Sequence, residues 1–398
     1  MRCPPRPVRI FLVGSEFFGA PGGIQRVNCL LLEMLAEFSA GTPAEVEIFS
    51  FADQSGPKPG GIAAAPGFCW HAFGRSRTAM AVQLGRRLRE VQPDLLLFTH
   101  AHLLRLARLA HLLRPRARIA VLGHGVEVWK SLPPSIRRWM QRADAVIAPS
   151  AYTRDKMVEM NEVDPARMTV LAHGLDAAWV AGAPAGPRGK RLLSVTRLGL
   201  ADAYKGIDVV LRALPTVLEK HPGASYVIAG DGSDRPRLEK LARELGIRDR
   251  VEFCGEVTGS RLRTLYSEAD LFVLPSQKEG FGIVFLEAMS YGLPVVAARA
   301  AGALDVIQDG VTGLLVPPDQ PDALAWALEG LLADAAHRQT LGEAGRKRVV
   351  ENFSFEHFSQ RWQRWLAEVL PEAIYCSRQA AAFARAIAPV AEAKERAA

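Results

Sequence analysis

Two glutamates and two glycines in one short segment are the first candidates for chemistry in this chain. Glu279 follows the apolar run Leu271–Leu274, Gly280 and Gly282 come next, and Glu287 lies in the apolar helix pattern behind them. Glycines let backbone N–H groups approach a ligand at a helix start, where the dipole and the unpaired donors favour phosphate. With both carboxylates facing one cleft, the segment predicts a site for a diphosphate whose attached sugar donates hydrogen bonds to the glutamates.

Two cations precede this segment, at the end of another expected strand. Arg197 and Lys205 stand in SVTRLGLADAYKGID, after the apolar run Leu192–Thr196. A departing nucleoside diphosphate builds up negative charge, and two fixed cations neutralise that charge as the bond breaks. The pattern therefore favours phosphate chemistry at this position as well.

These segments resemble a known family. The spacing Glu279-x7-Glu287 inside PSxxEGFGxxxLEAMxxGxPVVA looks like the motif of the retaining glycosyltransferases of family 4, and Arg197 and Lys205 match that family's diphosphate-binding cations. The resemblance runs from the N-terminal strand to about Leu370. It implies the GT-B architecture, in which two Rossmann-like, doubly wound α/β domains face each other across a cleft, with a C-terminal helix that crosses back to the N-terminal domain.

The resemblance also assigns residues to roles. In VLGHGVEVW, His124 matches the residue that contacts the transferred sugar across the cleft. The catalytic residues implied are His124, Arg197, Lys205 and Glu279. The residues implied to bind the donor are Gly22, Gly23, Ser150, Gly230, Gly280, Phe281, Gly282, Ile283 and Glu287.

The chain departs from the family pattern in three places. The loop between Arg197 and Lys205 is longer than in many relatives, His173 stands where relatives often have asparagine, and Asp305 replaces a glutamate. His100 and His102 follow another expected strand and are interpreted as structural. The chain has no Asp-x-Asp pair of the kind that binds a metal on the diphosphate in the other main glycosyltransferase architecture, so we expect no metal and no cofactor.

Apolar runs that alternate with helical patterns predict parallel sheets covered on both faces. The domains expected are residues 1–177, which bind the acceptor, a linker at 178–190, residues 191–353, which bind the nucleotide sugar, and a C-terminal helix and tail at 354–398. Helix spacing in the last part predicts one apolar stripe through Phe358, Trp362 and Trp365. The strands expected are Val8–Gly14, Val46–Phe51, Leu95–Thr99, Ile119–Leu122, Val146–Ala148, Thr169–Leu171, Leu192–Thr196, Tyr226–Ala229, Val251–Cys254, Leu271–Leu274, Val295–Ala297 and Gly313–Val316.

Composition and charge narrow the class of protein. The 398 residues are 49% hydrophobic and 23% charged, with no apolar stretch of signal-peptide or membrane-span length, and the five cysteines are scattered. Residues 1–176 contain 22 Lys and Arg against 15 Asp and Glu, whereas residues 177–398 contain 27 against 27. The net charge of +7 therefore belongs to the N-terminal half, where solvated helix faces and an anionic partner are the competing interpretations. We expect a cytoplasmic protein, with peripheral contact to the inner face of the membrane under the second interpretation.

The sequence as a whole predicts a retaining, metal-independent hexosyltransferase. The donor is a GDP- or UDP-sugar, with GDP-mannose favoured by the resemblance to mannosyltransferases of lipid-linked or exopolysaccharide assembly. The acceptor expected is an anionic lipid-linked or saccharide molecule, and nucleic acid is not expected because stacking aromatics are missing among the arginines. A nucleotide-sugar epimerase or hydrolase of similar fold, or a non-catalytic sugar-binding subunit, remains an alternative.

Overall fold

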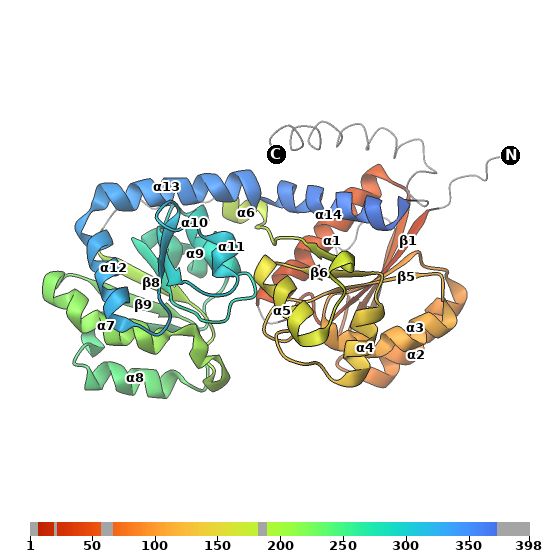
Figure 1. The fold of residues 1–398 in the computed structure, drawn as a ribbon, viewed down its shortest axis with the longest axis horizontal. Helices are drawn as coiled ribbons and strands as arrows, with labels where there is room; N and C mark the ends of the chain where they lie inside the picture. The colour runs from red at the N-terminus through yellow and green to blue at the C-terminus, as the bar shows by residue number, and fades with distance from the viewer. Residues whose placement is uncertain (1–6, 20–21, 57–66, 182–188, 372–398) are drawn as a thin grey trace. The chain divides into compact units, whose positions relative to one another are not determined.

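The computed structural model describes residues 7–19, 22–56, 67–181 and 189–371, which fold as two compact units. The first unit takes in the described residues up to Pro149, Thr153–Leu171 and those from Phe358 onward. The second unit takes in Ser150–Tyr152 and the described residues of Ala172–His357. Each unit contains one parallel sheet with helices between its strands (Figure 1).

The first unit has a seven-stranded sheet in the order β3-β2-β1-β4-β5-β6-β7. Its strands are β1 (Val8–Gly14), β2 (Ala44–Ser50), β3 (Phe68–Ala72), β4 (Leu95–Phe98), β5 (Arg118–Leu122), β6 (Ala145–Ala148) and β7 (Met168–Val170). Its helical elements are α1 (Gly23–Gly41), α2 (Arg77–Glu90), η2 (Ala101–Leu106), α3 (Ala107–Leu113), α4 (Pro134–Arg142), α5 (Ala151–Asn161) and η3 (Pro165–Arg167). Strands β4 and β6 are apolar throughout, as expected where helices cover both faces of a parallel sheet.

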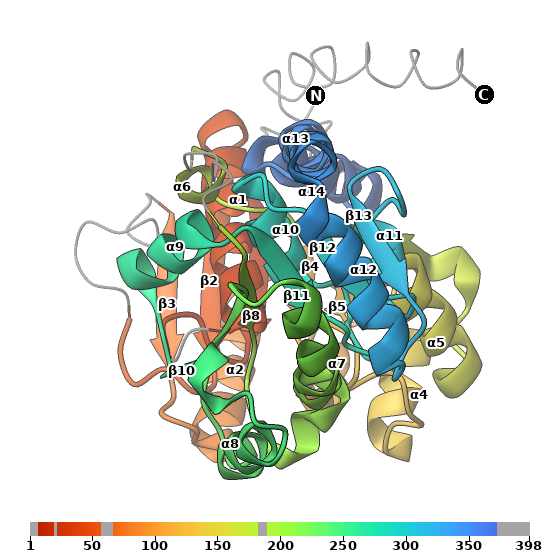
Figure 2. The same cartoon turned by 90° about the vertical axis from the view of Figure 1, so that its left-hand side faces the viewer.

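The second unit has a six-stranded sheet in the order β10-β9-β8-β11-β12-β13. Its strands are β8 (Arg191–Val195), β9 (Ser225–Ala229), β10 (Val251–Gly255), β11 (Leu271–Leu274), β12 (Val295–Ala298) and β13 (Gly313–Val316). Its helical elements are α6 (Ala177–Val180), η4 (Leu200–Lys205), α7 (Ile207–Lys220), α8 (Arg235–Glu244), η5 (Arg248–Arg250), α9 (Gly259–Glu268), α10 (Ile283–Ser290), α11 (Ala303–Val306), α12 (Pro321–Ala333) and α13 (Ala335–Asn352). Helices α7 and α12 pack together on one face of the sheet, and α10 and α13 pack together on the other (Figures 1 and 2).

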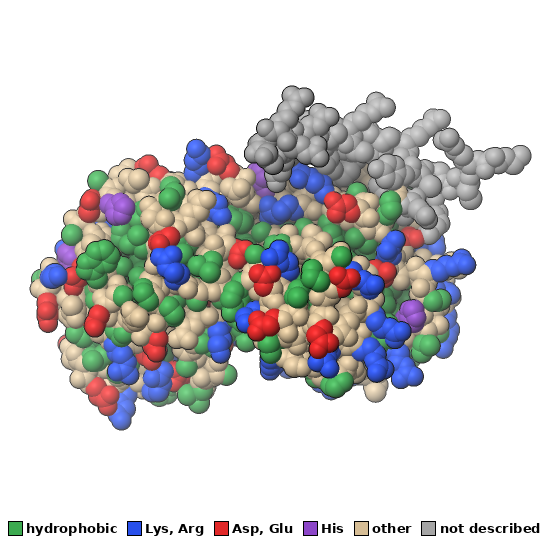
Figure 3. All heavy atoms as spheres, in the orientation of Figure 1, with side chains coloured by type: hydrophobic (Ala, Val, Ile, Leu, Met, Phe, Trp, Pro, Cys, Tyr) green, Lys and Arg blue, Asp and Glu red, His purple; other side chains and the backbone are tan. Residues whose placement is uncertain are grey.

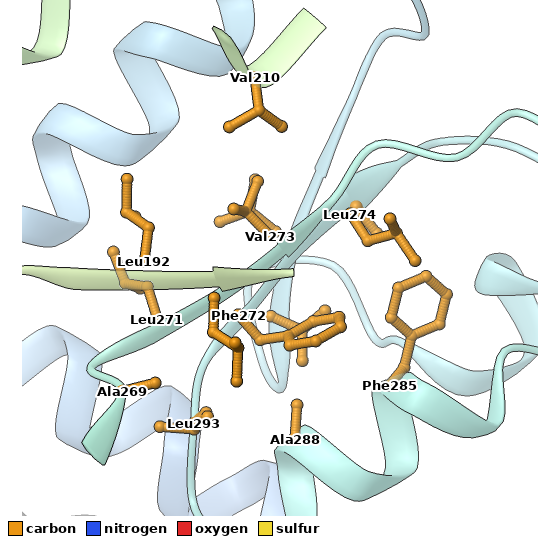
Figure 4. Close-up of a cluster of buried hydrophobic side chains, with 14 of the residues drawn as sticks. Leu192, Val210, Ala269, Leu271, Phe272, Val273, Leu274, Phe285, Ala288 and Leu293 are labelled. Carbon is orange, nitrogen blue, oxygen red and sulfur yellow. The ribbon is translucent and has the colours of Figure 1, made fainter. Parts of the chain in front are cut away.

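The core of the second unit is centred on β11. Its four residues, Leu271–Leu274, are fully buried, and their side chains alternate between Val210 on α7 and Phe285 on α10 (Figure 4). Because both faces of the strand are buried, all four of its residues are apolar, and the sequence shows an unbroken apolar run. Because β11 is fixed from both faces, the loop that follows it starts from a rigid point.

The two-domain α/β fold predicted from the sequence is confirmed, and one strand was missed. The strand β3 lies at the edge of its sheet, pairs only with β2 and is half-buried, so its sequence FCWHA lacks the strong apolar signal of a central strand. Part of the expected linker forms the short helix α6, whose Trp179 packs edge-on against Tyr266 and Tyr291 of the second unit. The rest of that linker, 182–188, lies outside the described residues, as does the tail beyond residue 371.

The last described helix, α14 (Phe355–Val369), belongs to the first unit from Phe358 onward. Its predicted stripe is buried at Phe358, Trp362 and Trp365. On the same helix the Ser359 hydroxyl donates a 2.5 Å hydrogen bond to Glu37 of α1. The crossing of this helix back to the N-terminal domain is thereby confirmed. No helix in the described part of the chain combines the length and the apolar character needed to cross a bilayer.

Candidate functional site

Three of the candidate residues lie in loops at one edge of the second sheet. Strands β8 and β11 are parallel neighbours, so the loops that follow them leave the same edge. Arg197 and Lys205 follow β8, and Glu279 follows β11. The Lys205 ammonium lies 2.6 Å from Glu279 Oε1, and the two side chains are 16% and 11% exposed. The structure therefore brings one cation and one carboxylate of the predicted set into direct contact.

Arg197 differs from Lys205 in its exposure and in its partner. Its side chain is 78% exposed, and its Nη2 donates to Asp202 Oδ1 over 3.1 Å. The same Asp202 oxygen accepts a 3.1 Å hydrogen bond from the Tyr204 hydroxyl. The Tyr204 ring lies under two ammonium groups, 5.4 Å from Lys205 Nζ and 5.7 Å from Lys278 Nζ. Asp202, Tyr204 and Lys278 had not been predicted, because only the folded loop brings them to the cations.

The loop of Glu279 closes onto the start of α10. Gly282 is the N-cap residue, and its φ of 93° lies in the region that favours glycine. Behind it, the Gly302 N–H donates to the Glu279 carbonyl over 2.8 Å, and a Cβ on Gly302 would lie 2.5 Å from the Gly280 carbonyl oxygen. Ile283, the first residue of α10, is half-buried. The glycines thus permit the close packing of this loop against the segment that precedes α11 and at the start of α10.

Phe281 points into the protein and not toward a ligand. It is buried, and its ring packs edge-on against His173 at 5.3 Å and against Phe353 at 5.8 Å. Its predicted part in donor binding can therefore come only from its backbone. His173, which stands where the family often has asparagine, makes that aromatic contact in this chain.

Glu279 and Glu287 lie in different surroundings. Glu287, on the second turn of α10, is 3% exposed and accepts a 2.7 Å hydrogen bond from the hydroxyl of fully buried Tyr266. The sequence had suggested that both carboxylates face one cleft, but the structure gives Glu287 a donor inside the protein. Its contact with a donor sugar stays a prediction.

Two further predicted donor residues lie near these loops. Gly230 has a φ of 146°, and a Cβ there would collide with the Thr196 carbonyl, so this position requires glycine for packing alone. Ser150 belongs to the second unit, where its hydroxyl donates a 2.7 Å hydrogen bond to the Gly280 carbonyl. Beside it the Ala151 N–H donates to Asp305 Oδ1 over 2.9 Å. Ser150 thus fixes the glycine loop. Its place in the sequence, between β6 and α5, does not indicate this role.

His124 lies in the first unit, after β5. Its Nε2 is 2.6 Å from the Thr99 carbonyl oxygen, which can only accept, so Nε2 carries the proton. Burial lowers the pKa of His124, against the opposite effect of the Glu127 carboxylate. The neutral ring therefore has Nδ1 as an acceptor, and its contact with a sugar hydroxyl stays a prediction. His100 stacks on His102, with ring centroids 5.2 Å apart, and its own centroid is 6.0 Å from that of His124.

Gly22 and Gly23 form the start of α1 in the same unit. Gly22 is the N-cap residue, with an extended backbone, and its carbonyl accepts from the Arg26 N–H over 3.1 Å. Both glycines are exposed. Their placement leaves the first N–H groups of α1 accessible, and their contact with a donor stays a prediction.

Within the described ranges, one group of side chains brings metal-ligand atoms together. Glu47, Cys69 and His71 place theirs within 4.8 Å of one another on the neighbouring strands β2 and β3. Arg87, however, donates to both oxygens of Glu47, over 2.6 and 2.8 Å. A cation would compete with this guanidinium for the carboxylate, so an ion-pair network is the better account of the group.

Two family models match the chain, one after the other. The model described as Glycosyltransferase Family 4 matches residues 21–179, and the model described as Glycosyl transferases group 1 matches residues 184–348. Among curated relatives, the GDP-mannose-dependent alpha-(1-6)-phosphatidylinositol monomannoside mannosyltransferase of Mycobacterium tuberculosis is 34% identical over 270 residues, which are 62% of this chain and 70% of the relative. An uncharacterized glycosyltransferase of Methanocaldococcus jannaschii is 41% identical over 171 residues, and the match spans 43% of each chain.

Solved structures show the same fold. A glycosyltransferase from Rickettsia africae superposes with a TM-score of 0.75 at 18% identity, covering 92% of this chain and 99% of that one. Anabaena HepE in complex with UDP gives a TM-score of 0.72 at 20% identity, covering 91% of this chain and all of the other. Two parallel Rossmann-like sheets and these likenesses agree on the GT-B architecture. The chain belongs to the family 4 glycosyltransferases.

Proposed function

We propose that this protein is a retaining, metal-independent hexosyltransferase that takes a sugar from a nucleotide-sugar donor. The observation that carries the proposal is the convergence of Arg197, Lys205 and Glu279 on one sheet edge, beside the glycine-capped start of α10. Two cations and a set of helix N–H groups suit a diphosphate. A carboxylate beside them suits the hydroxyls of the attached sugar.

The proposed chemistry is loss of a nucleoside diphosphate from the anomeric carbon. Arg197 and Lys205 stabilise the negative charge that develops on the phosphate oxygens, and the α10 dipole adds to this effect. These groups supply the charge that a divalent metal supplies in other transferases. The leaving phosphate then takes the proton of the acceptor hydroxyl on the same face of the sugar, so the anomeric configuration is retained.

The donor we favour is GDP-mannose, with UDP-sugars next. Support comes from the mycobacterial relative, which is named as GDP-mannose-dependent. A D-inositol 3-phosphate glycosyltransferase of Salinispora arenicola is equally similar at 34% identity, and HepE was solved with UDP. The relatives therefore leave the base and the sugar to direct measurement.

The acceptor we propose is an anionic lipid-linked or saccharide molecule presented at a membrane surface. Exposed arginines lie on neighbouring elements of the first unit, and Figure 3 shows Lys and Arg side chains gathered over α2, α3 and α4. Within the described residues, Arg105, Arg108 and Arg138 form no ion pair. Exposed Val82 and Leu112 lie on two of the same helices. We call the set Arg86, Arg89, Arg105, Arg108 and Arg138 the basic face.

A donor panel tests the proposal. The protein is assayed with UDP-, GDP- and ADP-sugars, first by thermal shift, because a ligand that binds the native state raises the midpoint, and then by sugar transfer to lipid-linked and saccharide acceptors. We expect one donor to stabilise the protein and to support transfer in excess EDTA. Loss of turnover on chelation, restored by Mn²⁺ or Mg²⁺, would contradict metal independence. Sugar release without an acceptor would identify a hydrolase, and binding without turnover a non-catalytic subunit.

A further inference from the structure

The segment between Arg197 and Lys205 is fixed to the loops on both sides of it. The Leu200 N–H donates to Ser233 Oγ over 3.1 Å, beyond β9. At the other end the Gln277 N–H donates to the Tyr204 carbonyl over 2.9 Å, beyond β11. The segment ends at Gly206, whose φ of 73° places it against Pro275. These contacts make the additional residues of this loop a defined structure.

Asp202 is the acidic side chain of that segment, and it is 15% exposed. One of its oxygens, Oδ1, accepts from both Arg197 Nη2 and the Tyr204 hydroxyl. In the described part of the chain this is the only ion pair of Arg197, whose side chain otherwise extends into solvent. An exposed arginine samples many rotamers, so a fixed acceptor selects those that keep the guanidinium at the sheet edge.

Tyr204 supports this arrangement in two ways. Burial and the neighbouring Asp202 carboxylate raise its pKa to about 12, so at neutral pH its hydroxyl remains a donor to Asp202. Its ring faces the ammonium groups of Lys205 and Lys278, an arrangement that the ring quadrupole favours. One tyrosine thus contacts the acceptor of Arg197 and also the second cation.

We propose that Asp202 and Tyr204 are positioning residues for the transfer proposed above. Asp202 holds the guanidinium by Nη2 and leaves Nε and Nη1 to meet the departing diphosphate. Tyr204 holds Asp202 and keeps Lys205 beside it. This arrangement raises the rate of transfer because charges already in place need no reorganisation while the bond breaks. This inference rests on the proposed function and assigns residues that the sequence comparison left without a role.

A double-mutant cycle tests it. With the donor that the wild-type protein turns over, Asp202→Ala is expected to lower kcat about tenfold with little change in donor KM, and Tyr204→Phe to lower it a few-fold. In an Arg197→Ala background, both substitutions are expected to have no further effect on kcat, because the residue that they position is gone. The matched control is Glu239→Ala, which removes another arginine partner of the same unit, that of Arg235 on α8, and should leave kcat unchanged.

A binding measurement separates this inference from the proposed function. By calorimetry, Asp202→Ala should weaken UDP or GDP several-fold and leave the corresponding monophosphate unchanged, even if turnover is never detected. If Asp202→Ala lowers kcat equally in the wild-type and Arg197→Ala backgrounds, the positioning role is overturned. Tighter diphosphate binding in Asp202→Ala would also overturn it, since Asp202 would then be competing for the guanidinium. If Asp202→Ala fails to fold, Tyr204→Phe decides, because it removes a single hydroxyl.

Discussion

Arg197 and Lys205 reach the same sheet edge with different partners. Lys205 is half-buried against Glu279, whereas Arg197 is mostly exposed and bound to Asp202. A ligand phosphate would thus compete with a short ion pair at Lys205 but would find most N–H groups of Arg197 accessible. The two cations are therefore expected to differ in how they respond to substitution.

The first prediction concerns Arg197→Ala. We expect kcat to fall roughly 100-fold or more with a smaller change in donor KM, because the charge matters most when the phosphate is leaving. Steady-state kinetics with varied donor measure both parameters. Arg299→Ala, which removes an exposed arginine paired with Asp309 in the same unit, serves as the control. A rise in KM at unchanged kcat would limit Arg197 to ground-state binding.

The second prediction concerns Glu287→Ala. The substitution removes the acceptor of a hydrogen bond from the buried Tyr266 hydroxyl, so the free energy of unfolding should fall by about 1 to 3 kcal/mol. Donor affinity should also fall by about 1 to 3 kcal/mol if Glu287 accepts hydrogen bonds from the ligand. Urea denaturation and calorimetry measure the two effects. Tyr266→Phe is expected to reproduce only the loss of stability, and unchanged donor affinity in Glu287→Ala would leave the carboxylate a purely structural role.

At this scale the sequence was informative where a motif carries the side chains. Lys205 and Glu279 were predicted as site residues, and the fold brings them together. Asp202 could not be found in this way, because its contact with Arg197 depends on the path of a loop without periodicity. The bond from Ser150 to the Gly280 carbonyl joins residues far apart in the sequence, and no local pattern encodes such a contact.

At the scale of elements, the glycine loop before α10 depends on close packing behind it. Gly302→Ala would place a methyl group 2.5 Å from the Gly280 carbonyl and 2.8 Å from the Glu279 carbonyl, so the loop must move. A shift of about 1 Å in a positioning loop can cost on the order of 100-fold in rate. We therefore expect a large loss of kcat with a folded protein, measured by kinetics and circular dichroism.

Gly330→Ala is the control for that substitution. Gly330 lies inside α12, and a Cβ there would meet nothing within 4 Å. Alanine is better than glycine in a helix by up to about 1 kcal/mol, so this variant should be slightly more stable and fully active. Full activity in Gly302→Ala would show that the loop tolerates displacement.

The loop elements after β4 and β5 should make stability depend on pH. Burial lowers the pKa of His100 from 6.5 to about 4, opposed by Glu127 and assisted by His124 and His102. The unfolded chain therefore takes up a proton near pH 6.5 that the folded chain refuses, and stability falls as pH decreases from about 6.5 to 4. The slope is about 1.4 kcal/mol per pH unit for each such histidine.

Urea denaturation at several pH values in that window measures the slope. In His100→Gln we expect a shallower loss, because one depressed histidine is removed. An equal slope in His100→Gln would show that other groups cause the loss of stability at acidic pH.

The Glu47 carboxylate acts in a lower pH range. Burial alone would raise its pKa, but its bonds to His71 and Arg87 lower the pKa overall, so its contribution to stability is lost only below its ordinary value of 4.5.

Element boundaries were predicted within about two residues wherever a strand is fully buried. All six strands of the second sheet and six of the seven in the first had been expected from apolar runs. The edge strand β3 was not, because its residues are half-buried on both faces and its neighbours in sequence are rich in glycine and proline. The order of the strands was not predicted, since periodicity does not specify which strands pair. The crossing of the C-terminal helix to the N-terminal domain came from the family resemblance.

At the scale of the whole molecule, charge and chemistry are divided between the two units. The second unit carries the proposed diphosphate site, and the charge excess of the sequence lies in the half that forms most of the first. The basic face is an exposed part of that half, and its Arg105, Arg108 and Arg138 have no acidic partner within the described residues. This arrangement suits a transferase whose donor is soluble and whose acceptor is held at an anionic surface.

Binding to lipid vesicles tests that division directly. We expect the protein to co-sediment with vesicles that contain anionic lipid and not with neutral ones, and binding should weaken as salt increases, because surface fields decay within about 8 Å at physiological ionic strength. Each basic residue near the surface can contribute on the order of 1 kcal/mol, so Arg105→Glu with Arg108→Glu should reduce binding at least tenfold. The matched control is Lys240→Glu with Arg243→Glu on α8 of the second unit, where both residues are exposed. Equal binding to neutral and anionic vesicles, or no binding to either, would return the basic face to ordinary solvated helix surface and favour a soluble saccharide acceptor.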